Sequence, residues 1–463
     1  MAFQIAVNSS SNGVQYAVDA LNGLLIPTGI TVVSSEDAAV YANGGGASVQ
    51  VFGFVGGYQG LKLGNDGTPG DVITIGSSGT IASLREAVML KSTNAVLTNY
   101  GQIHASTSAA VVLNSASGGL AGRILNYGMI QGNGGIYAAT GTGEVRIINY
   151  GTISSIGSKA IYTDLGNDRL INRGQIEGDV DLYSGNDTLL NRGLMTGDVT
   201  TGSGSDVVDN RSGTIDGSID LGSNADTFMP GAGAETVDGG ADIDTLDFSR
   251  SSGVTVALDA SIDGTGWAKD DIYIGFESII GSNSGNDTLI GGNASNILSG
   301  YGGNDILNGL AGADTLYGGR GADRLDGGAN NDELNGEAGR DTLIGGAGFD
   351  KLTGGADADK FVFALADVAG SAKNGSFDKI FDFKHAEGDK IDLSAIDANT
   401  NLAQNQAFTF IGTKAFHNVT GELKIEAVVA GYLLQGDTNG DGVADFTIAV
   451  QPDAVLVAAD FVL

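Results

Sequence analysis

The sequence predicts an all-β protein, in which a parallel β-helix continues into a tighter parallel β-roll and ends in a C-terminal β-sandwich-like module. Two repeats support this fold class, and together they occupy most of the 463 residues. An Asn-x-Gly pattern recurs at nearly regular intervals within 24–220, and a nine-residue unit recurs nine times without an insertion over 282–362. Self-similarity at a fixed period is the signature of a solenoid, in which neighbouring repeats share one core.

The first segment, residues 1–23, is expected to cap the open end of the solenoid. Residues 9–12 are good helix N-cap residues, and Val14, Ala17, Val18 and Leu21 follow at helical spacing before Asn22-Gly23. We therefore predict a short amphipathic helix over residues 9–23. Because this segment lacks basic residues, a membrane-surface helix is a poorer interpretation.

Residues 24–220 are expected to form the parallel β-helix. Its repeat places an Asn between two apolar residues and a Gly, and the series consists of Asn99, Asn126, Asn149, Asn172 and Asn191, fading at Asn210. A stacked Asn ladder would satisfy turn carbonyls inside the solenoid, with a ligand site as the alternative. The accompanying column of Tyr100, Tyr127 and Tyr150 is interpreted as packing, with a sugar-binding platform as the alternative. This part is similar to the parallel β-helices of bacterial surface adhesins and polysaccharide-acting enzymes.

The nine-residue unit fills 282–362, and three earlier units fill 221–247. Position one is Gly in every copy of the second block except the first, position six is almost always Asp, and position eight is Leu or, in the last copy, Phe. We expect glycines at positions one, two and four to permit positive-φ turns and to expose backbone carbonyls. The Asp carboxylate completes an oxygen environment of the kind that calcium prefers. The last three residues would form a short strand with one inward Leu.

Several calcium ions are therefore expected along these turns. The predicted ligands in the second block are Asp287, Asn296, Asp305, Asp314, Asp323, Asp332, Asp341, Asp350 and Asp359, with Gly300, Gly302, Gly309, Gly318, Gly327, Gly336, Gly345 and Gly354. Those in the first block are Asp226 and Asp244. The second unit departs from the pattern at Ala294 and Asn296, and Asn330 and Asp357 replace Gly at position four.

The nine-residue unit resembles the RTX calcium-binding nonapeptide family, G-G-x-G-x-D-x-U-x. The resemblance implies export by the type I secretion machinery through an uncleaved C-terminal signal. The chain ends in Asp460-Phe461-Val462-Leu463, an acidic residue followed by apolar ones, which is similar to such a signal. The expected location is therefore extracellular or on a bacterial cell surface.

Two further acidic sets are weaker candidates for calcium. Asp168, Asp187 and Asp206 recur at equal intervals, each ahead of an apolar strand, and they predict either a sparser calcium row or solvated turns. Asp437, Asn439, Asp441 and Asp445 match positions 1, 3, 5 and 9 of an EF-hand loop. Position 12 is Ile448 instead of Glu, so a tight hairpin turn is an equal alternative.

Residues 248–281 are expected to interrupt the roll as a connecting segment. Beyond 362 the glycines become sparse, and alternating patterns predict strands over 379–383, 390–393, 407–411, 422–425, 432–435 and 444–450. Residues 240–463 resemble the C-terminal part of serralysin-type metalloproteases. This resemblance assigns 363–463 to a β module that carries the secretion signal.

The amino-acid composition limits the classes of partner that the chain is expected to bind. The 55 Asp and Glu outnumber the 23 Lys and Arg, which gives a formal charge of −32, so nucleic acid is excluded as a partner and metal is favoured. The sequence contains no apolar run of 18 residues, so no membrane span is predicted. Cysteine is absent, and residues 1–8 lack the features of a cleavable signal. The remaining expected partners are calcium, a second copy of the chain, and surface or extracellular polysaccharide.

The chemistry of a protease is missing. The three histidines, His104, His385 and His417, are isolated, so the two His at i and i+4 of a zinc metalloprotease are absent. We therefore favour a non-enzymatic role: a secreted calcium-binding protein that folds on calcium and acts as a structural or adhesive surface or matrix protein, including assembly as a layer or filament. The alternative is a polysaccharide-modifying lyase, epimerase or glycosidase with its site on 24–220.

Overall fold

A computed structural model describes residues 3–5, 9–11, 16–17, 23–42, 46–64, 70–114, 119–139, 141–259, 261–368, 377–399, 402 and 404–463. The chain divides into two compact units. Unit 1 comprises Met1–Asp244 and Asp271–Gly275, and unit 2 comprises Thr245–Asp270 and Phe276–Leu463. Regular structure in both units is almost entirely β-strand, which confirms the predicted fold class.

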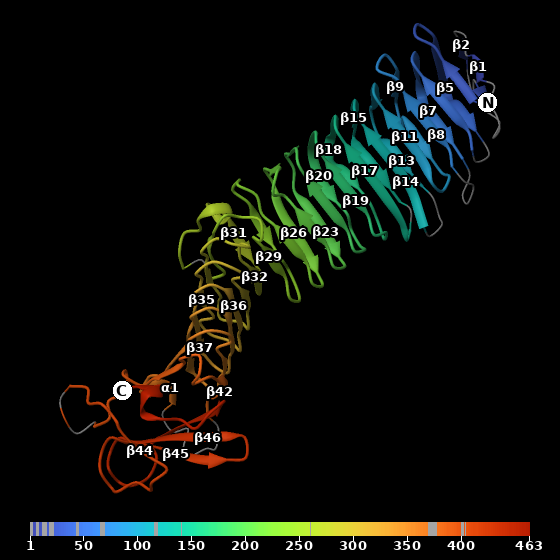
Figure 1. Ribbon diagram of the computed structural model, residues 1–463. Coiled ribbons are helices and arrows are strands. Elements are labelled where there is room, and N and C mark those ends of the chain that lie inside the picture. Colours follow the sequence, from blue (N-terminus) through green and yellow to red (C-terminus); the bar gives the residue numbers. More distant parts are fainter. Residues whose placement is uncertain are drawn as a thin grey trace. The chain divides into compact units, whose positions relative to one another are not determined.

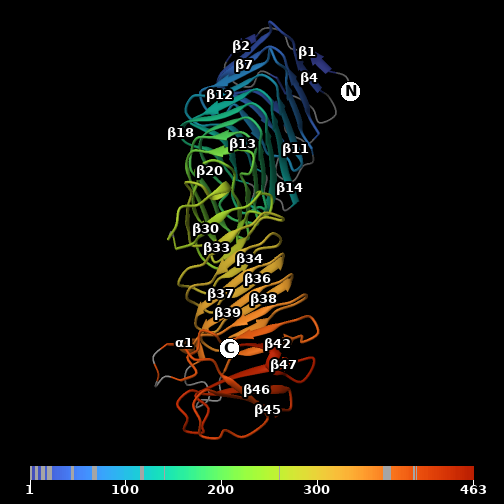
Figure 2. The same ribbon diagram turned by 60° about the vertical axis from the view of Figure 1, so that its left-hand side comes forward.

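Unit 1 is a parallel β-helix (Figures 1 and 2). Its first sheet takes one short strand from each coil, and each strand pairs in parallel with those of the neighbouring coils. The strands are β1 (Phe3–Ile5), β4 (Gly23–Ile26), β6 (Ser48–Val51), β8 (Val72–Ile75), β11 (Ala95–Asn99), β14 (Gly119–Asn126), β17 (Gly143–Asn149), β19 (Arg169–Asn172), β21 (Thr188–Asn191), β24 (Val207–Asp209) and β27 (Thr227–Met229).

The second sheet of unit 1 takes either one long strand or two short strands from most coils, and one short strand from each of the last two. The long strands are β5 (Thr31–Ala42), β7 (Phe54–Leu63), β18 (Thr152–Tyr162) and β20 (Gln175–Asp181). The short ones are β2 (Ser9–Ser11), β3 (Tyr16–Ala17), β9 (Thr80–Ser83), β10 (Val88–Leu90), β12 (Gln102–Ala105), β13 (Ala109–Leu113), β15 (Met129–Gly132), β16 (Gly134–Ala138), β22 (Leu194–Met195), β23 (Val199–Ser203), β25 (Thr214–Ile215), β26 (Ser218–Ser223), β28 (Thr236–Asp238) and β31 (Ile272–Ile274).

The helix predicted over residues 9–23 is wrong where the structure describes this segment. Residues 9–11 form β2 and residues 16–17 form β3, and both strands pair in parallel with β5. Residues 12–15 and 18–22 of the predicted helix lie outside the described residues. Coil-to-coil backbone hydrogen bonds outweigh a local helical pattern here, since a template strand lies alongside.

The core of unit 1 is a set of apolar columns closed at one corner by the Asn ladder. Each Asn of the ladder is at most 1% exposed, and its amide Nδ2 donates to the Oδ1 of the Asn in the next coil at 2.8 to 2.9 Å, from Asn99 through to Asn210. Asn126 Nδ2 also donates to the carbonyl oxygens of Gly128 and Thr152. These bonds satisfy the turn carbonyls, and burial leaves the amides no access to a ligand.

Replacement of one ladder residue should therefore destabilise unit 1. Asn126→Ala removes the side chain that binds Asn99 Nδ2 on one side and Asn149 Oδ1 on the other. We therefore expect a loss of about 2 to 4 kcal/mol in free energy of unfolding. Asn114→Ala, at an exposed position of the same unit, is the control and should change stability by less than about 0.5 kcal/mol. Urea unfolding followed by circular dichroism gives both values. Equal effects would contradict the structural role of the ladder.

Unit 2 contains the β-roll, in which successive nonapeptides alternate between two parallel sheets so that two nonapeptides make one coil. One sheet contains β29 (Thr245–Asp247), β32 (Ser278–Ile280), β34 (Ile297–Ser299), β36 (Thr315–Arg320), β38 (Glu333–Ala338), β40 (Lys351–Thr353) and β42 (Lys379–Phe383). The other contains β30 (Thr255–Ala257), β33 (Thr288–Ile290), β35 (Ile306–Asn308), β37 (Arg324–Ala329), β39 (Thr342–Ala347), β41 (Lys360–Val362), β43 (Lys390–Asp392) and β48 (Phe461–Val462). The Leu at position eight is fully buried in every unit that has it.

The C-terminal strands extend these sheets. β42 also pairs with β47 (Phe446–Pro452), which is antiparallel to β46 (Gly431–Asp437). β46 is in turn antiparallel to β45 (Glu422–Val428), and β44 (Thr409–Gly412) pairs in parallel with β45. All six strands predicted beyond residue 362 are present, with small shifts at their ends.

In the part of the chain that the structure describes, helices are few and short: α1 (Leu365–Val368), and the 3-10 turns η1 (Gly266–Ala268) and η2 (Ala458–Asp460). Among the described residues, no helix has the length and apolar character needed to cross a membrane.

Candidate calcium sites

Two aspartate ladders run along the roll, one at each row of turns. In each ladder the position-six carboxylate Oδ1 accepts a hydrogen bond from the backbone N–H of the position-six residue one coil earlier. One ladder runs from Asp287 through Asp305, Asp323, Asp341 and Asp359 to Asp389, and the other from Asn296 through Asp314, Asp332 and Asp350 to Asp378. The donor–acceptor distances are 2.7 to 3.0 Å. Backbone repetition therefore fixes one oxygen of each carboxylate.

The second oxygen, Oδ2, faces a cradle that is open only because position one is Gly. A Cβ atom at Gly327 would lie 2.5 Å from Asp332 Oδ2 and 2.6 Å from the carbonyl oxygen of Gly345 in the next coil. A Cβ at Gly300, Gly309, Gly318 or Gly336 would likewise lie 2.3 to 2.9 Å from the equivalent Asp Oδ2 and glycine carbonyl oxygen. In the last two nonapeptides, the three atoms nearest to a Cβ at Gly345 or Gly354 all belong to the following Asp.

This geometry corrects the role expected for position one. The glycines there do not adopt positive φ; they are required for space. Positive φ occurs instead at positions two and four, for example at Gly319 and Gly321, and even side chains such as Tyr301 adopt it at position two. Gly302, at position three, donates its backbone N–H to the Gly300 carbonyl within the same turn.

A cation fits these cradles. Within the 282–362 block, seven position-six carboxylates have a buried Oδ2 that accepts no hydrogen bond from the described residues: Asp305, Asp314, Asp323, Asp332, Asp341, Asp350 and Asp359. A buried carboxylate oxygen without a donor is costly, and a hard cation bound by carboxylate and carbonyl oxygens removes that cost. No three His, Asp or Glu side chains converge as a metal site among the described residues, so backbone carbonyls must supply the other ligands.

Burial shifts the acidity of the same carboxyls. Desolvation raises the pKa of Asp332 to about 7, and with the neighbouring Asp323 and Asp359 charges it raises that of Asp341 to about 8. Desolvation also raises the pKa of Asp314 to about 6. Backbone hydrogen bonds lower each value only in part. Without a cation, these groups are therefore partly protonated near neutral pH.

Calcium binding should consequently release protons. Because the folded pKa of each carboxyl exceeds its unfolded value, protonation of these carboxyls stabilises the metal-free roll. This contribution to the free energy of unfolding is complete below about pH 4 and is lost as pH rises through about 6 to 8. Calcium needs the ionised form, so the calcium concentration at the folding midpoint should fall about tenfold or more between about pH 6 and pH 8. Circular-dichroism calcium titrations at the two pH values measure this shift. A midpoint independent of pH would contradict the assignment.

Two predicted ligands differ from the rest. Asp287 Oδ2 accepts from the backbone N–H and the hydroxyl of Ser282, at 2.7 and 3.0 Å, because Ser replaces Gly at position one. At Asn296 the cradle oxygen Oδ1 accepts from the backbone N–H of Gly292 at 2.7 Å, while the amide Nδ2 donates to the Glu277 carbonyl at 3.2 Å. In both units the protein supplies the positive partner that a cation supplies elsewhere.

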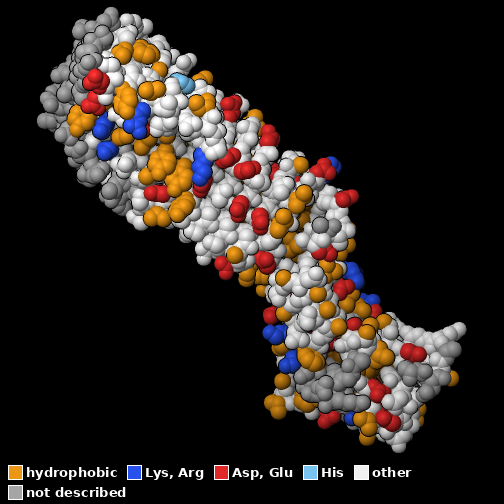
Figure 3. All heavy atoms as spheres, turned by 180° about the vertical axis from the view of Figure 1, so that it is seen from behind, with side chains coloured by type: hydrophobic (Ala, Val, Ile, Leu, Met, Phe, Trp, Pro, Cys, Tyr) orange, Lys and Arg blue, Asp and Glu red, His pale blue; other side chains and the backbone are white. Residues whose placement is uncertain are grey.

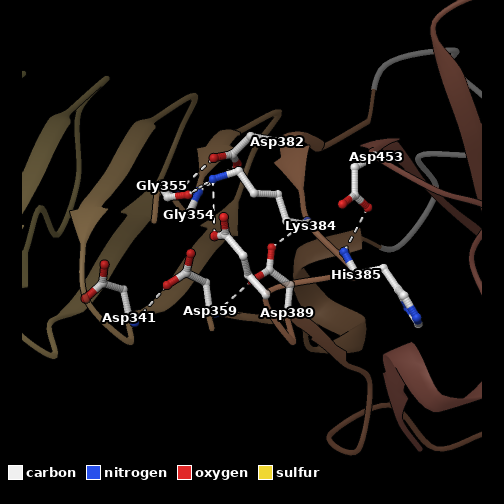
Figure 4. Close-up of polar contacts among 10 residues, drawn as sticks. Asp341, Gly354, Gly355, Asp359, Asp382, Lys384, His385, Asp389 and Asp453 are labelled. Carbon is white, nitrogen blue, oxygen red and sulfur yellow. Dashed lines mark hydrogen bonds and ion pairs between the residues drawn. The ribbon is translucent and has the colours of Figure 1, made fainter. Parts of the chain in front are cut away.

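Protein groups also close the C-terminal end of the ladders (Figure 4). The Asp382 carboxylate accepts from the backbone N–H groups of Gly354 and Gly355, both at 2.8 Å, and the Lys384 ammonium donates to the Gly355 carbonyl. Asp389 Oδ2 accepts from the backbone N–H of Lys384 at 2.7 Å. The sequence analysis missed this closure, since Asp382 and Lys384 lie outside the repeat and carry no periodic signal.

Unit 1 contains a third ladder, from Asp168 through Asp187, Asp206 and Asp226 to Asp244, with the same Oδ1 bonds at 2.6 to 2.8 Å. Only Asp244 has a glycine at position one: a Cβ at Gly239 would lie 2.9 Å from Asp244 Oδ2 and 2.5 Å from the Gly275 carbonyl oxygen. The equivalent residues for the other four are Thr163, Leu182, Thr201 and Leu221, all buried. The Oδ2 atoms of these four aspartates are also buried without a hydrogen bond from the described residues, so the difference from the roll is the side chain at position one. The hydroxyls of Thr163 and Thr201 donate to the carbonyls of Leu182 and Leu221, which leaves less of the cradle for a cation.

The EF-hand-like loop is filled by hydrogen bonds of its own. Asp437 accepts from the backbone N–H groups of Asn439, Gly440 and Gly442, and Asp445 accepts from Thr438 and from the Asn439 amide. Asp441 Oδ1 accepts from the backbone N–H of Val443. These bonds are those of a tight turn between β46 and β47.

The last residues of the chain are part of the fold. β48 pairs with β43, and the buried Asp460 carboxylate lies 2.6 Å from His385 Nδ1 and accepts from the backbone N–H of Val457. A receptor could reach this segment fully only when it is detached from β43.

Comparison with known protein families finds a calcium-binding repeat in these coils. The family model of the RTX calcium-binding nonapeptide repeat matches four times, at residues 218–247, 282–316, 308–343 and 335–364. The comparison with curated proteins gives no match. The matched residues contain the five complete cradles of unit 2 and, in unit 1, Gly239 and Asp244. The chain is therefore a calcium-binding protein with RTX nonapeptide repeats, which bind several calcium ions, and such repeats are typical of secreted proteins.

Proposed function

We propose that this protein is exported unfolded, folds on calcium outside the cell, and serves as a structural or adhesive component of a cell surface or matrix. One observation supports the proposal above all: successive coils of the roll are joined through cradles whose buried carboxylate oxygens lack donors among the described residues. Calcium at each cradle would connect one coil to the next. Binding energy then becomes folding energy.

The calcium ligands follow from the same geometry. In unit 2 we assign them to Asp305, Asp314, Asp323, Asp332 and Asp341, with the position-one glycine carbonyl of the following coil. Asp350, Asp359 and Asp244 are assigned to cradles with fewer or different carbonyls, whereas Asp287 and Asn296 are assigned to coil contacts without metal. Weak affinity suffices outside the cell, where calcium is roughly millimolar.

The secretion signal fits this order of events. We propose that Asp460, Phe461, Val462 and Leu463 belong to a signal that the type I machinery reads before folding. In the fold, Asp460 is buried and β48 is paired, so a chain kept unfolded at low calcium presents the segment and a folded chain does not.

A self-assembling layer or filament is the form of this role that we test first. Purified protein is examined by electron microscopy in about millimolar calcium and in chelator. We expect ordered sheets or filaments only with calcium. Dispersed single particles under both conditions would reject assembly and leave adhesion as a monomer.

A polysaccharide-modifying enzyme is the second candidate, and a groove on unit 1 supports it. The groove, of about 590 Å³, is lined by Glu86, Lys159, Tyr137 and Tyr162 over an apolar floor, and Figure 3 shows basic side chains beside hydrophobic ones on this unit. Burial raises the pKa of Glu86, but hydrogen bonds from Gln59 and Ser108 outweigh it and keep that pKa below its usual value.

The spacing of the groove favours binding over catalysis. Glu86 and Lys159 are three coils apart, which separates their backbones by about 14 Å and makes a concerted action on one bond difficult. Incubation with neutral and uronate polysaccharides, followed by assay of reducing ends and unsaturated products, decides the matter. Product that disappears in both Glu86→Gln and Lys159→Met would establish the enzyme.

A further inference from the structure

Three arginines of unit 1 gather on one face, although they are scattered in the sequence. β14, β17 and β19 pair in a register that places Arg123 opposite Arg146 and Arg146 opposite Arg169. All three side chains are exposed. With about 4.8 Å between neighbouring strands, they form a straight column parallel to the solenoid axis, which we call the arginine column.

Two further columns lie beside the arginine column on the same face. Residues two positions further along each strand form an aliphatic column of half-exposed side chains: Leu125, Ile148, Ile171 and Leu190. Two positions beyond these is the tyrosine column, in which the rings of Tyr100, Tyr127 and Tyr150 stack at 4.8 to 4.9 Å with interplanar angles of 2 to 9°. Arg173 continues it over the Tyr150 ring at 5.7 Å, and Arg192 follows one coil later.

This arrangement is costly for the isolated protein. Like charges placed opposite each other on neighbouring strands destabilise a sheet. Within the described part of the chain, the only acidic partner on the column is Glu144, whose carboxylate binds the Arg146 guanidinium at 2.5 and 2.9 Å. Among the described residues, no ion pair involves Arg123 or Arg169. The face therefore carries excess positive charge on a chain whose formal charge is −32.

The stacked tyrosines exclude a ring-on-ring sugar platform. Each ring face in the middle of the column is covered by the next ring, so only ring edges and hydroxyls reach solvent, and each ring is 43 to 49% exposed. A ligand must therefore lie across the face and combine anionic groups for the arginines with apolar surface for the aliphatic column.

We propose that this face binds an anionic polysaccharide along the solenoid axis. Carboxylate or sulfate groups along the polymer would pair with Arg123, Arg146 and Arg169, and the C–H faces of the rings would cover the aliphatic column. Arg173 and Arg192 would add charge at one end. The inference deepens the adhesive role proposed above, since it names the partner, and it is independent of self-assembly.

The test uses the full chain, folded in about millimolar calcium, on immobilised hyaluronan, dextran sulfate and uncharged dextran. We expect binding to the two anionic polymers and none to dextran. The variant R123Q/R146Q/R169Q should weaken binding about a hundredfold, and R123K/R146K/R169K, which keeps the charge, should recover most of it. The control R320Q/R324Q/R340Q removes the same charge from exposed positions of unit 2 and should change affinity less than about threefold.

Folding is checked by thermal unfolding, and the column variant should be as stable as the parent or more so because like charges are removed. Equal weakening by column and control variants, or no weakening by the column variant, would overturn the proposal. Binding of polyaspartate as tight as that of hyaluronan would instead indicate an acidic polypeptide partner, such as a second copy, and would reject the polysaccharide. Electron microscopy of the column variant tests the proposed function separately. Calcium-dependent assembly of this variant would support the proposed function even where the polysaccharide proposal fails.

Discussion

In calcium-free buffer at neutral pH, unit 2 should lose its β-roll, and about millimolar calcium should restore it. Seven buried carboxylate oxygens of the roll accept no hydrogen bond from the described residues. Each uncompensated buried charge costs about 3 to 5 kcal/mol, so the total exceeds the 5 to 15 kcal/mol by which a typical protein is stable. Protonation relieves part of this cost, but only with pKa values near 6 to 8.

Far-ultraviolet circular dichroism during a calcium titration measures the effect, and magnesium at the same concentration is the control. Magnesium requires near-octahedral geometry and dehydrates reluctantly, so it should restore little structure. Full β structure in excess chelator would refute calcium-gated folding. Asp332→Asn offers a second measurement: like Asn296 it has no charge to bury, so it should stabilise the metal-free roll while removing one calcium.

Gly327→Ala should block one cradle. The added Cβ would approach Asp332 Oδ2 and the Gly345 carbonyl oxygen at 2.5 and 2.6 Å, where a cation ligated by both oxygens would lie. We expect one calcium fewer per chain by titration calorimetry and a loss of about 2 to 4 kcal/mol in calcium-bound stability.

Gly292→Ala is the matched control, because a Cβ there meets no atom within 4 Å. It should leave calcium stoichiometry unchanged and stability within about 0.5 kcal/mol of the parent. If Gly327→Ala bound as much calcium as the parent, position one would not be part of the cradle. If both variants lost stability equally, the effect would be a general one of glycine replacement.

The fold class, the two solenoid types and the aspartate positions were predictable from the sequence because they depend on strict periodicity. A nine-residue period places Leu289 and its equivalents inward and Asp305 and its equivalents at the turns, whatever surrounds them. The Asn ladder from Asn99 to Asn210 was predictable for the same reason. The N-terminal helix was not, because pairing of β2 and β3 with β5 overrides the local pattern there.

The tertiary structure decided which carboxylates retain an oxygen for a cation. The donors at the exceptions depart from the consensus repeat: the Ser282 hydroxyl at Asp287 and, at the C-terminal end, the Lys384 backbone N–H at Asp389. The arginine column has the same origin. Arg123, Arg146 and Arg169 are equally spaced but far apart in the sequence, and only the coil length of the solenoid turns that spacing into contact between neighbouring strands. The sequence by itself determines what repeats, whereas three-dimensional packing determines which chemical groups meet, because hydrogen bonds and charges act through space.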